Sequence, residues 1–102
     1  MQLKHHVSIG DWFELDIGDG RATVRGECDL ATASRIQPWL AIFDGHPLDI
    51  DLSEVTGFDA AALRAFLEMR QRNPRLRVIN PSRPVQNVFE VTDTHCLTDG
   101  TT

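Results

Sequence analysis

The sequence predicts an α/β domain in which a mixed, four- to five-stranded sheet carries helices on one face. Segments in which apolar and polar residues alternate indicate half-exposed strands. Segments with apolar residues three and four positions apart indicate amphipathic helices. The order is strand, strand, helix, strand, helix, strand, helix, which favours helices packed against one side of a sheet.

Length and composition are those of a single domain. The chain has 102 residues, so we expect one domain over 1–102, with a core from about 12 to 98 and short flexible termini. Its formal charge of -5 argues against nucleic acid as the main partner, because phosphate contacts need a basic surface. No segment approaches the roughly 18 apolar residues that span a bilayer, and residues 1–10 do not resemble a secretory signal. We therefore expect a cytoplasmic protein without direct membrane insertion.

The N-terminal half is expected to form a hairpin and a helix. Strands over 12–17 and 21–25 flank the turn Gly18-Asp19-Gly20, a strong hairpin signal. A helix follows over about 32–43, although Pro38 should kink or loosen it because proline lacks a backbone donor. The apolar stripe of this helix is expected to consist of Leu30, Ala33, Ile36, Leu40 and Phe43.

The centre of the chain predicts a strand, a polar loop and a capped helix. In the strand 48–52, Asp49 and Asp51 alternate with apolar residues, so we expect both on the solvent face rather than in a metal or acid–base site. After a loop over 53–58, Asp59 is a natural N-cap for a helix that runs to about residue 72. Weak ion pairs are expected on the outer face of this helix, from Arg64, Glu68 and Arg72.

The C-terminal third predicts a strand over 76–80 and a helix over about 85–92, with Ser82 as the helix cap. A short terminal strand over 94–98 is left open. Several arginines gather near these elements, which we interpret as a solvated helix end and loop rather than a partner-facing basic patch; they are Arg70, Arg72, Arg75, Arg77 and Arg83.

The sequence does not assemble the groups that an enzyme or a metal site needs. The histidines have no acidic partners at helical or hairpin spacing; they are His5, His6, His46 and His95. No glycine-rich phosphate loop is present either. We therefore expect no catalytic activity, no cofactor and no metal. Cys28 and Cys96 are expected to be free thiols, with a regulatory disulfide between them left open.

Three motifs, in order along the chain, resemble those of a known family. They are Gly26-Glu27-Cys28-Asp29-Leu30-Ala31-Thr32, then Leu48-Asp49-Ile50-Asp51-Leu52-Ser53-Glu54-Val55 leading to Asp59, then Val78-Ile79-Asn80-Pro81-Ser82. Together they resemble the STAS domain, the family that includes bacterial anti-sigma-factor antagonists. The resemblance spans residues 13–97 and implies a mixed sheet with helices on one side.

The resemblance also implies a partner-switching role. In the antagonists, a kinase-like anti-sigma factor phosphorylates the second serine of an Asp-Ser-Ser-Gly-Leu motif at a helix start. The unphosphorylated antagonist binds that anti-sigma factor and frees the sigma factor. Matched position by position, Ala60 and Ala61 replace the two serines and Ala62 replaces the glycine. Because Ala61 stands at the phosphoacceptor position and has no hydroxyl, we expect the usual switch to be lost.

We therefore expect a non-enzymatic regulator that binds a protein, as an anti-sigma-factor antagonist does, without phosphorylation at the usual position. The partner-binding surface is expected to comprise the loop before the helix, the helix start, its outer face and a nearby acidic residue: Asp29, Thr56, Gly57, Phe58, Asp59, Ala60, Ala61, Ala62, Arg64 and Glu68. Thr56 and Ser53 are alternative phosphoacceptors, although loop hydrogen bonding is the simpler role for their hydroxyls.

Other interpretations stay open. Some STAS proteins are accessory subunits that dock on the ATPase of a lipid transporter or another ABC transporter, and their sequences look similar. Sensing of a nucleotide or lipid is a third interpretation, although no residue specifies a ligand. Assembly into a homodimer is also left open.

Overall fold

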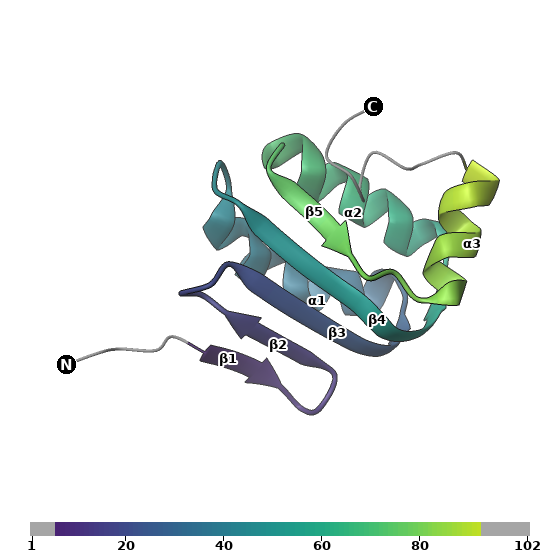
Figure 1. Ribbon diagram of the computed structural model, residues 1–102, viewed down its shortest axis with the longest axis horizontal. Helices are drawn as coiled ribbons and strands as arrows, with labels where there is room; N and C mark the ends of the chain where they lie inside the picture. Colours follow the sequence, from purple (N-terminus) through teal and green to yellow (C-terminus); the bar gives the residue numbers. More distant parts are fainter. Residues whose placement is uncertain (1–5, 93–102) are drawn as a thin grey trace.

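The computed structural model describes residues 6–92, which form a five-stranded sheet and three α-helices (Figure 1). In chain order the elements are β1 (His6–Ile9), β2 (Phe13–Asp16), β3 (Arg21–Cys28), α1 (Leu30–Leu40), the short 3-10 helix η1 (Ala41–Phe43), β4 (Leu48–Phe58), α2 (Ala60–Arg72), β5 (Leu76–Ile79) and α3 (Arg83–Thr92). The strands lie in the order β1-β2-β3-β4-β5, antiparallel from β1 to β3 and parallel from β3 to β5. The predicted α/β class with a mixed sheet is confirmed.

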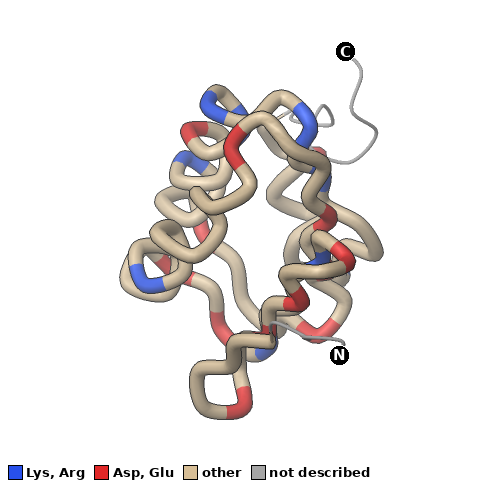
Figure 2. Tube along the Cα trace, turned by 90° about the vertical axis from the view of Figure 1, so that its left-hand side faces the viewer, with Lys and Arg blue, Asp and Glu red and all other residues tan. Residues whose placement is uncertain are grey.

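Helices α1 and α2 cover one face of the sheet and form a separate layer when the molecule is viewed edge-on (Figure 2). Each is the crossover between two parallel strands, α1 from β3 to β4 and α2 from β4 to β5. The core fills the space between the layers. Its largest fully buried side chains include Phe13, Leu15, Ile36, Leu48, Ile50, Leu52, Phe66 and Leu76.

The sheet has five strands, within the predicted number, but its strands differ from the prediction in place and length. β1 lies before residue 12, where we expected only a flexible terminus, and pairs with β2. β3 continues to Cys28 and β4 to Phe58, so the turn expected after residue 25 and the loop expected over 53–58 are strands. Register shifts between Thr23 and Arg25, and between Gly26 and Glu27, interrupt the alternation of side chains. Such irregularities hide a strand from a period-two pattern.

Helix α1 begins at Leu30, two residues earlier than predicted, and ends at Leu40, after which η1 tightens the chain. This ending fits the loosening expected from Pro38. The prediction that Leu30 belongs to the core stripe is wrong, because its side chain is 54% exposed. Leu30 lies about 100° of helix rotation from the centre of the stripe, which consists of Ala33, Ile36, Leu40 and Phe43.

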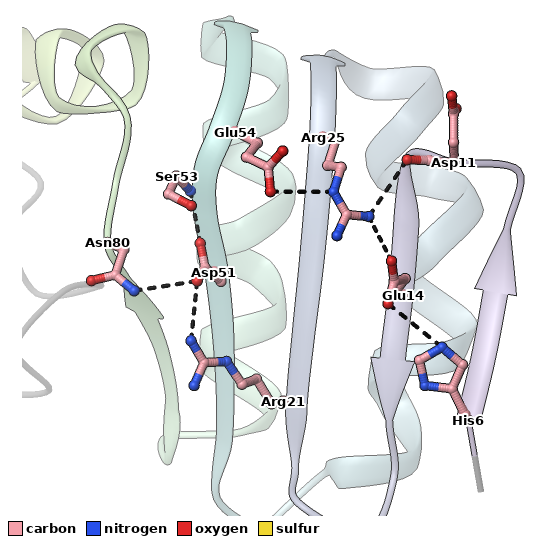
Figure 3. A network of polar contacts seen from close by, with 9 residues as sticks. All are labelled: His6, Asp11, Glu14, Arg21, Arg25, Asp51, Ser53, Glu54 and Asn80. Atoms are coloured by element: carbon pink, nitrogen blue, oxygen red, sulfur yellow. Dashed lines mark hydrogen bonds and ion pairs between the residues drawn. The ribbon is translucent and has the colours of Figure 1, made fainter.

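Within residues 6–92, no helix covers the other face of the sheet, which carries polar side chains that pair across the strands (Figure 3). Arg25 on β3 lies 2.8 Å from a Glu14 oxygen on β2 and 3.3 Å from a Glu54 oxygen on β4. Glu14 also lies 3.6 Å from the His6 ring nitrogen on β1. Cross-strand pairs of opposite charge let this face remain in water while it adds modestly to sheet stability.

Asp51 lies on this polar face but is only 9% exposed, so the prediction that it faces solvent is wrong. Its carboxylate accepts hydrogen bonds from Arg21 Nη2 at 3.1 Å, Asn80 Nδ2 at 3.2 Å and the Ser53 N–H at 2.8 Å (Figure 3). Burial alone raises the pKa of Asp51, but the hydrogen bonds outweigh it and lower the pKa from 3.8 to about 2. Asp51 therefore joins β3, β4 and the residue that follows β5.

The start of α3 differs from the prediction. The Ser82 carbonyl accepts the Gln86 N–H at 2.8 Å, and the Ser82 N–H donates to the Leu52 carbonyl at 3.2 Å. Its buried hydroxyl, however, has no hydrogen-bond partner within residues 6–92, so the side chain does not cap the helix. The ion pairs expected on α2 from Arg64, Glu68 and Arg72 are likewise not formed among the described residues. The strand predicted over 94–98 lies outside the described residues.

Asn73 is polar but only 1% exposed. It links the end of α2 to the connection between η1 and β4. Its Nδ2 donates to the Phe43 carbonyl at 2.7 Å and the His46 carbonyl at 2.8 Å. Its Oδ1 accepts the Arg75 N–H at 3.1 Å. One side chain therefore satisfies three backbone groups from three segments.

We expect Asn73→Ala to lower the free energy of unfolding by about 2–3 kcal/mol, because it leaves buried backbone groups without partners. Urea unfolding followed by circular dichroism measures the change. The exposed neighbour Gln71 supplies the control, since Gln71→Ala should change stability by less than about 0.5 kcal/mol. Similar effects of the two substitutions would show that Asn73 does not hold these segments together.

The low pKa of Asp51 predicts a pH-dependent contribution to stability. Since the pKa is about 2 in the folded state and 3.8 otherwise, the contribution is complete above about pH 5 and disappears as the pH falls toward 2. We expect Asp51→Asn to cost about 2 kcal/mol at pH 7, with the difference from wild type shrinking below pH 4. Asp49→Asn is the control, because Asp49 is a half-buried neighbour whose pair with the exposed Arg77 contributes little. A pH-independent difference for Asp51→Asn would contradict this role.

Candidate functional site

The predicted site lies where the parallel strands β3 and β4 end side by side. Cys28 pairs with Phe58, and Glu27 pairs with Gly57. In each strand the next residue is an aspartate, Asp29 or Asp59, and each aspartate is followed by a helix. The parallel pairing therefore places two strand–aspartate–helix junctions next to each other.

Both aspartates are N-caps. Asp29 Oδ1 accepts the Thr32 N–H at 2.9 Å, and Asp59 Oδ1 accepts the Ala62 N–H at 2.8 Å. The hydrogen bond from the Thr32 N–H is the main reason that the pKa of Asp29 is lowered from its ordinary value. Each carboxylate also offsets the partial positive charge of its helix N-terminus, so both helix starts are already satisfied.

An open hollow of about 250 Å³ lies between the two junctions, lined by Glu27, Cys28, Asp29, Gly57, Phe58 and Asp59. Three of the lining side chains are carboxylates on exposed residues, which gives the hollow a negative rim. Phe58 is half-buried at its floor, with its ring 5.9 Å from Phe66 of α2 and 6.0 Å from Phe89 of α3. The hollow is therefore open, with an acidic rim and an aromatic side chain among its lining residues.

Cys28 offers no reactive thiol to this hollow. The residue is 1% exposed, and burial is the main reason that its pKa rises to about 12. The negative charges of Asp29 and Asp59 raise it further. Because the thiolate is the nucleophilic form, Cys28 is inert near neutral pH.

The three alanines at the start of α2 differ in solvent exposure. Ala60 and Ala61 are exposed on the first turn, whereas Ala62 is fully buried, so its side chain cannot contact a partner. Arg64 and Glu68 are exposed and continue the row that begins at Ala60, since residues four apart lie on one helix face. The predicted surface on α2 therefore consists of an uncharged first turn and a charged outer face.

The other predicted residues belong to β4. Thr56 is exposed, whereas Gly57 and Phe58 are half-buried. Ser53, the alternative phosphoacceptor, is exposed, and its N–H donates to Asp51. All four lie in β4 rather than in the expected loop, and Ser53 and Thr56 fall at the two irregularities of its pairing with β3. Thr56, Gly57 and Phe58 lie at the end of β4, whereas Ser53 lies five residues before it.

Sequence reasoning missed Glu27, the capping role of Asp29 and the exposure of Leu30. The cap was detectable, because an aspartate directly before an apolar helical period is a helix-start signal. The position of Glu27 in the hollow was not detectable from the sequence, because the strand register that places it there includes an irregularity. Two of the four histidines belong to the described residues and lie away from the hollow: His6 faces Glu14, and His46 is exposed before β4. Within residues 6–92, no three His, Cys, Asp or Glu side chains are arranged to hold a metal ion.

Among the described helices, none has the length and apolar character needed to cross a bilayer.

Comparison with known families agrees with this geometry. Residues 15–98 match a family model described as "Mlab, STAS domain", which covers most of the chain and all elements from β3 to α3. No curated protein sequence matches the chain. The resemblance derived from the three motifs is thereby confirmed at the level of the family.

The raised pKa of Cys28 predicts a protected thiol. At pH 8, a pKa of about 12 leaves about one thiol in ten thousand as thiolate. In a Cys96→Ser variant, we expect Cys28 to react with Ellman's reagent at least about 100-fold more slowly in native buffer than in 8 M urea. The urea sample also shows that the thiol is intact. Rapid reaction of the folded variant at pH 8 would mean that the thiol is accessible and ionised.

Proposed function

The chain belongs to the STAS domain family, and from this we propose that it is a non-enzymatic regulator that acts by docking on another protein. The observation that carries the proposal is the pair of adjacent, capped helix starts, with Ala60 and Ala61 exposed on the first turn of α2. Two short alanine side chains leave the first turn of α2 open to close approach. A surface with satisfied polar groups and no reactive side chain suits binding rather than catalysis.

We propose that the partner is a kinase-like anti-sigma factor and that binding does not depend on phosphorylation. The support is the family together with Ala61 at the position matched to the phosphoacceptor serine. In a switchable antagonist, phosphate adds roughly 1.5 to 2 negative charges at this helix start and releases the partner. A chain with alanine here remains competent to bind at all times. Its effect is then set by the amount of protein.

A second candidate is an accessory subunit that docks on the ATPase of a lipid transporter or another ABC transporter. The same alanine favours it, because a permanently assembled subunit needs no phosphorylation switch. The matched family description names Mlab and does not name an antagonist. Both candidates use the same surface and differ in the partner. Purification of the tagged protein from its own host, with mass spectrometry of bound proteins, separates a kinase-like anti-sigma factor from a transporter ATPase.

Introducing a charged side chain at position 61 tests the binding surface. We expect Ala61→Glu to weaken partner binding at least tenfold, about 1.4 kcal/mol, because a carboxylate must be desolvated in the interface. The same substitution should leave the fold intact, since an acidic residue in the first turn of a helix is favourable by about 0.3–1 kcal/mol. Binding is measured by calorimetry with the purified partner, and unfolding by circular dichroism.

Two variants complete the design. Ala61→Ser changes the shape little and should bind as the wild type does, whereas Gln71→Glu adds the same charge at the far end of α2 and should also bind normally. Equal binding by Ala61→Glu and wild type would remove this surface from the proposal. Incubation with the cognate kinase and ATP tests the loss of the switch: a stoichiometric phosphate on Thr56 or Ser53 would overturn phosphorylation-independent binding.

A further inference from the structure

Within residues 6–92, the second half of β4 has a neighbouring strand on one side only. β5 pairs with β4 from Leu48 to Asp51, whereas β4 continues to Phe58. On the other side, β3 pairs with β4 as far as Phe58, but two register shifts interrupt this pairing. The end of β4 that reaches the hollow is therefore held in the sheet by one irregular strand partner.

Helix α3 lies beside the part of β4 that β5 does not reach (Figure 1). At Asn80 the backbone has a positive φ of 50°, and the chain leaves the sheet here. The Ser82 N–H then donates to the carbonyl of Leu52 at 3.2 Å, and Leu52 is the first residue of β4 beyond its pairing with β5. α3 begins at the next residue, Arg83, so it supports this end of β4 in place of a strand.

Phe89 is the residue of α3 that touches the lining of the hollow. Its side chain is 2% exposed, and its ring centroid lies 6.0 Å from that of Phe58 at an interplanar angle of 85°. This edge-to-face arrangement is a favoured geometry for aromatic pairs. Phe66 of α2 contacts the same ring at 5.9 Å and 35°. Two rings from two helices therefore hold Phe58.

The Phe58 ring connects this packing to the hollow. Phe58 is half-buried, packs against the core and lines the hollow beside Asp59. Strand pairing fixes its backbone opposite Cys28. Packing fixes the direction of its ring, because a phenyl group has no donor or acceptor through which a hydrogen bond could hold it. The position of α3 therefore influences how the ring is presented to a partner.

We propose that α3 positions the docking site, and that Phe89 acts by holding the Phe58 ring in the orientation that the partner protein contacts. The inference rests on the proposed function, since it assigns a role at the same surface. Phe58 touches the partner, whereas Phe89 is a positioning residue that acts through Phe58. A side chain that is already held in its bound orientation loses less conformational freedom on binding, which strengthens the complex.

A double-mutant cycle tests this role, with affinity measured by calorimetry against the purified partner that the wild-type protein recovers. We expect Phe58→Ala to weaken binding at least about tenfold, because it removes an aromatic contact. Phe89→Leu should weaken binding at least about threefold, because leucine fills the buried site but lacks the ring edge. In the Phe58→Ala background, Phe89→Leu should change the affinity less than about 1.5-fold. Equal losses in both backgrounds would overturn the inference, since Phe89 would then act without Phe58.

Ile36→Val is the control for a general loss of stability. Ile36 is fully buried on α1, and the substitution removes one buried methyl group while the residue stays apolar. Urea unfolding followed by circular dichroism compares its stability with that of Phe89→Leu. The affinity of Ile36→Val should stay within about twofold of the wild type. If Ile36→Val weakens binding as much as Phe89→Leu does, the loss follows stability and the positioning role is wrong.

Fluorine NMR reports on the Phe58 ring directly. The chain contains five phenylalanines, so a protein labelled with fluorinated phenylalanine gives few signals, and that of Phe58 is the one missing from Phe58→Ala. In the free protein, Phe89→Leu should shift or broaden the Phe58 signal, whereas Ile36→Val should leave it unchanged. Adding the partner to the wild type should also shift it. A Phe58 signal that Phe89→Leu does not alter would overturn the positioning role.

The outcomes separate this inference from the proposed function. If Ala61→Glu weakens binding but Phe58→Ala does not, Phe58 is not a contact, and the inference fails although the proposed function stands. If Phe58→Ala weakens binding but Phe89→Leu does not, α3 does not position the docking site. If the wild type recovers neither an anti-sigma factor nor a transporter ATPase, both proposals fail.

Discussion

The parallel pairing of β3 with β4 is the constraint on which the rest of the molecule depends. It sets Cys28 beside Phe58 and therefore Asp29 beside Asp59, so that two helices start from the same edge of the sheet. Parallel strands need a crossover, which places α1 and then α2 on one face and encloses the core between them. The antiparallel strands β1 and β2 widen the sheet without covering its other face. That face remains exposed to solvent, and ion pairs centred on Arg25 link its strands.

Local patterns predicted the elements well but not their ends. Alternation located β2, β4 and β5, and Asp59 located the start of α2, because these signals are confined to a few neighbouring residues. β1 was missed, since a four-residue edge strand with alternating exposure forms only when β2 is there to pair with it. Asp51 was assigned to solvent because the residues that cover it, Arg21 and Asn80, are 30 and 29 positions away in the chain. Tertiary contacts decided all of these differences.

The candidate site was predictable to a similar degree. The resemblance pointed to the start of α2, and the structure places Ala60 and Ala61 there with their side chains exposed. The helix start at Asp29 was detectable from the sequence, but the hollow between the two junctions was not, because it depends on strand register. The exposure of Leu30 follows from its position about 100° of helix rotation from the centre of the buried stripe, once the start of α1 is known.

The exposed Ala61 has a consequence for the history of such a protein. Alanine and serine codons can differ by a single base, and the position already offers a helix start with a neighbouring turn open to another protein. Gain or loss of a phosphorylation site here therefore requires no change in the fold, because the buried Ala62 and the cap at Asp59 hold the helix independently of residue 61. Under the proposed function, a permanent and a switchable form of this domain would differ at residue 61 within an unchanged fold.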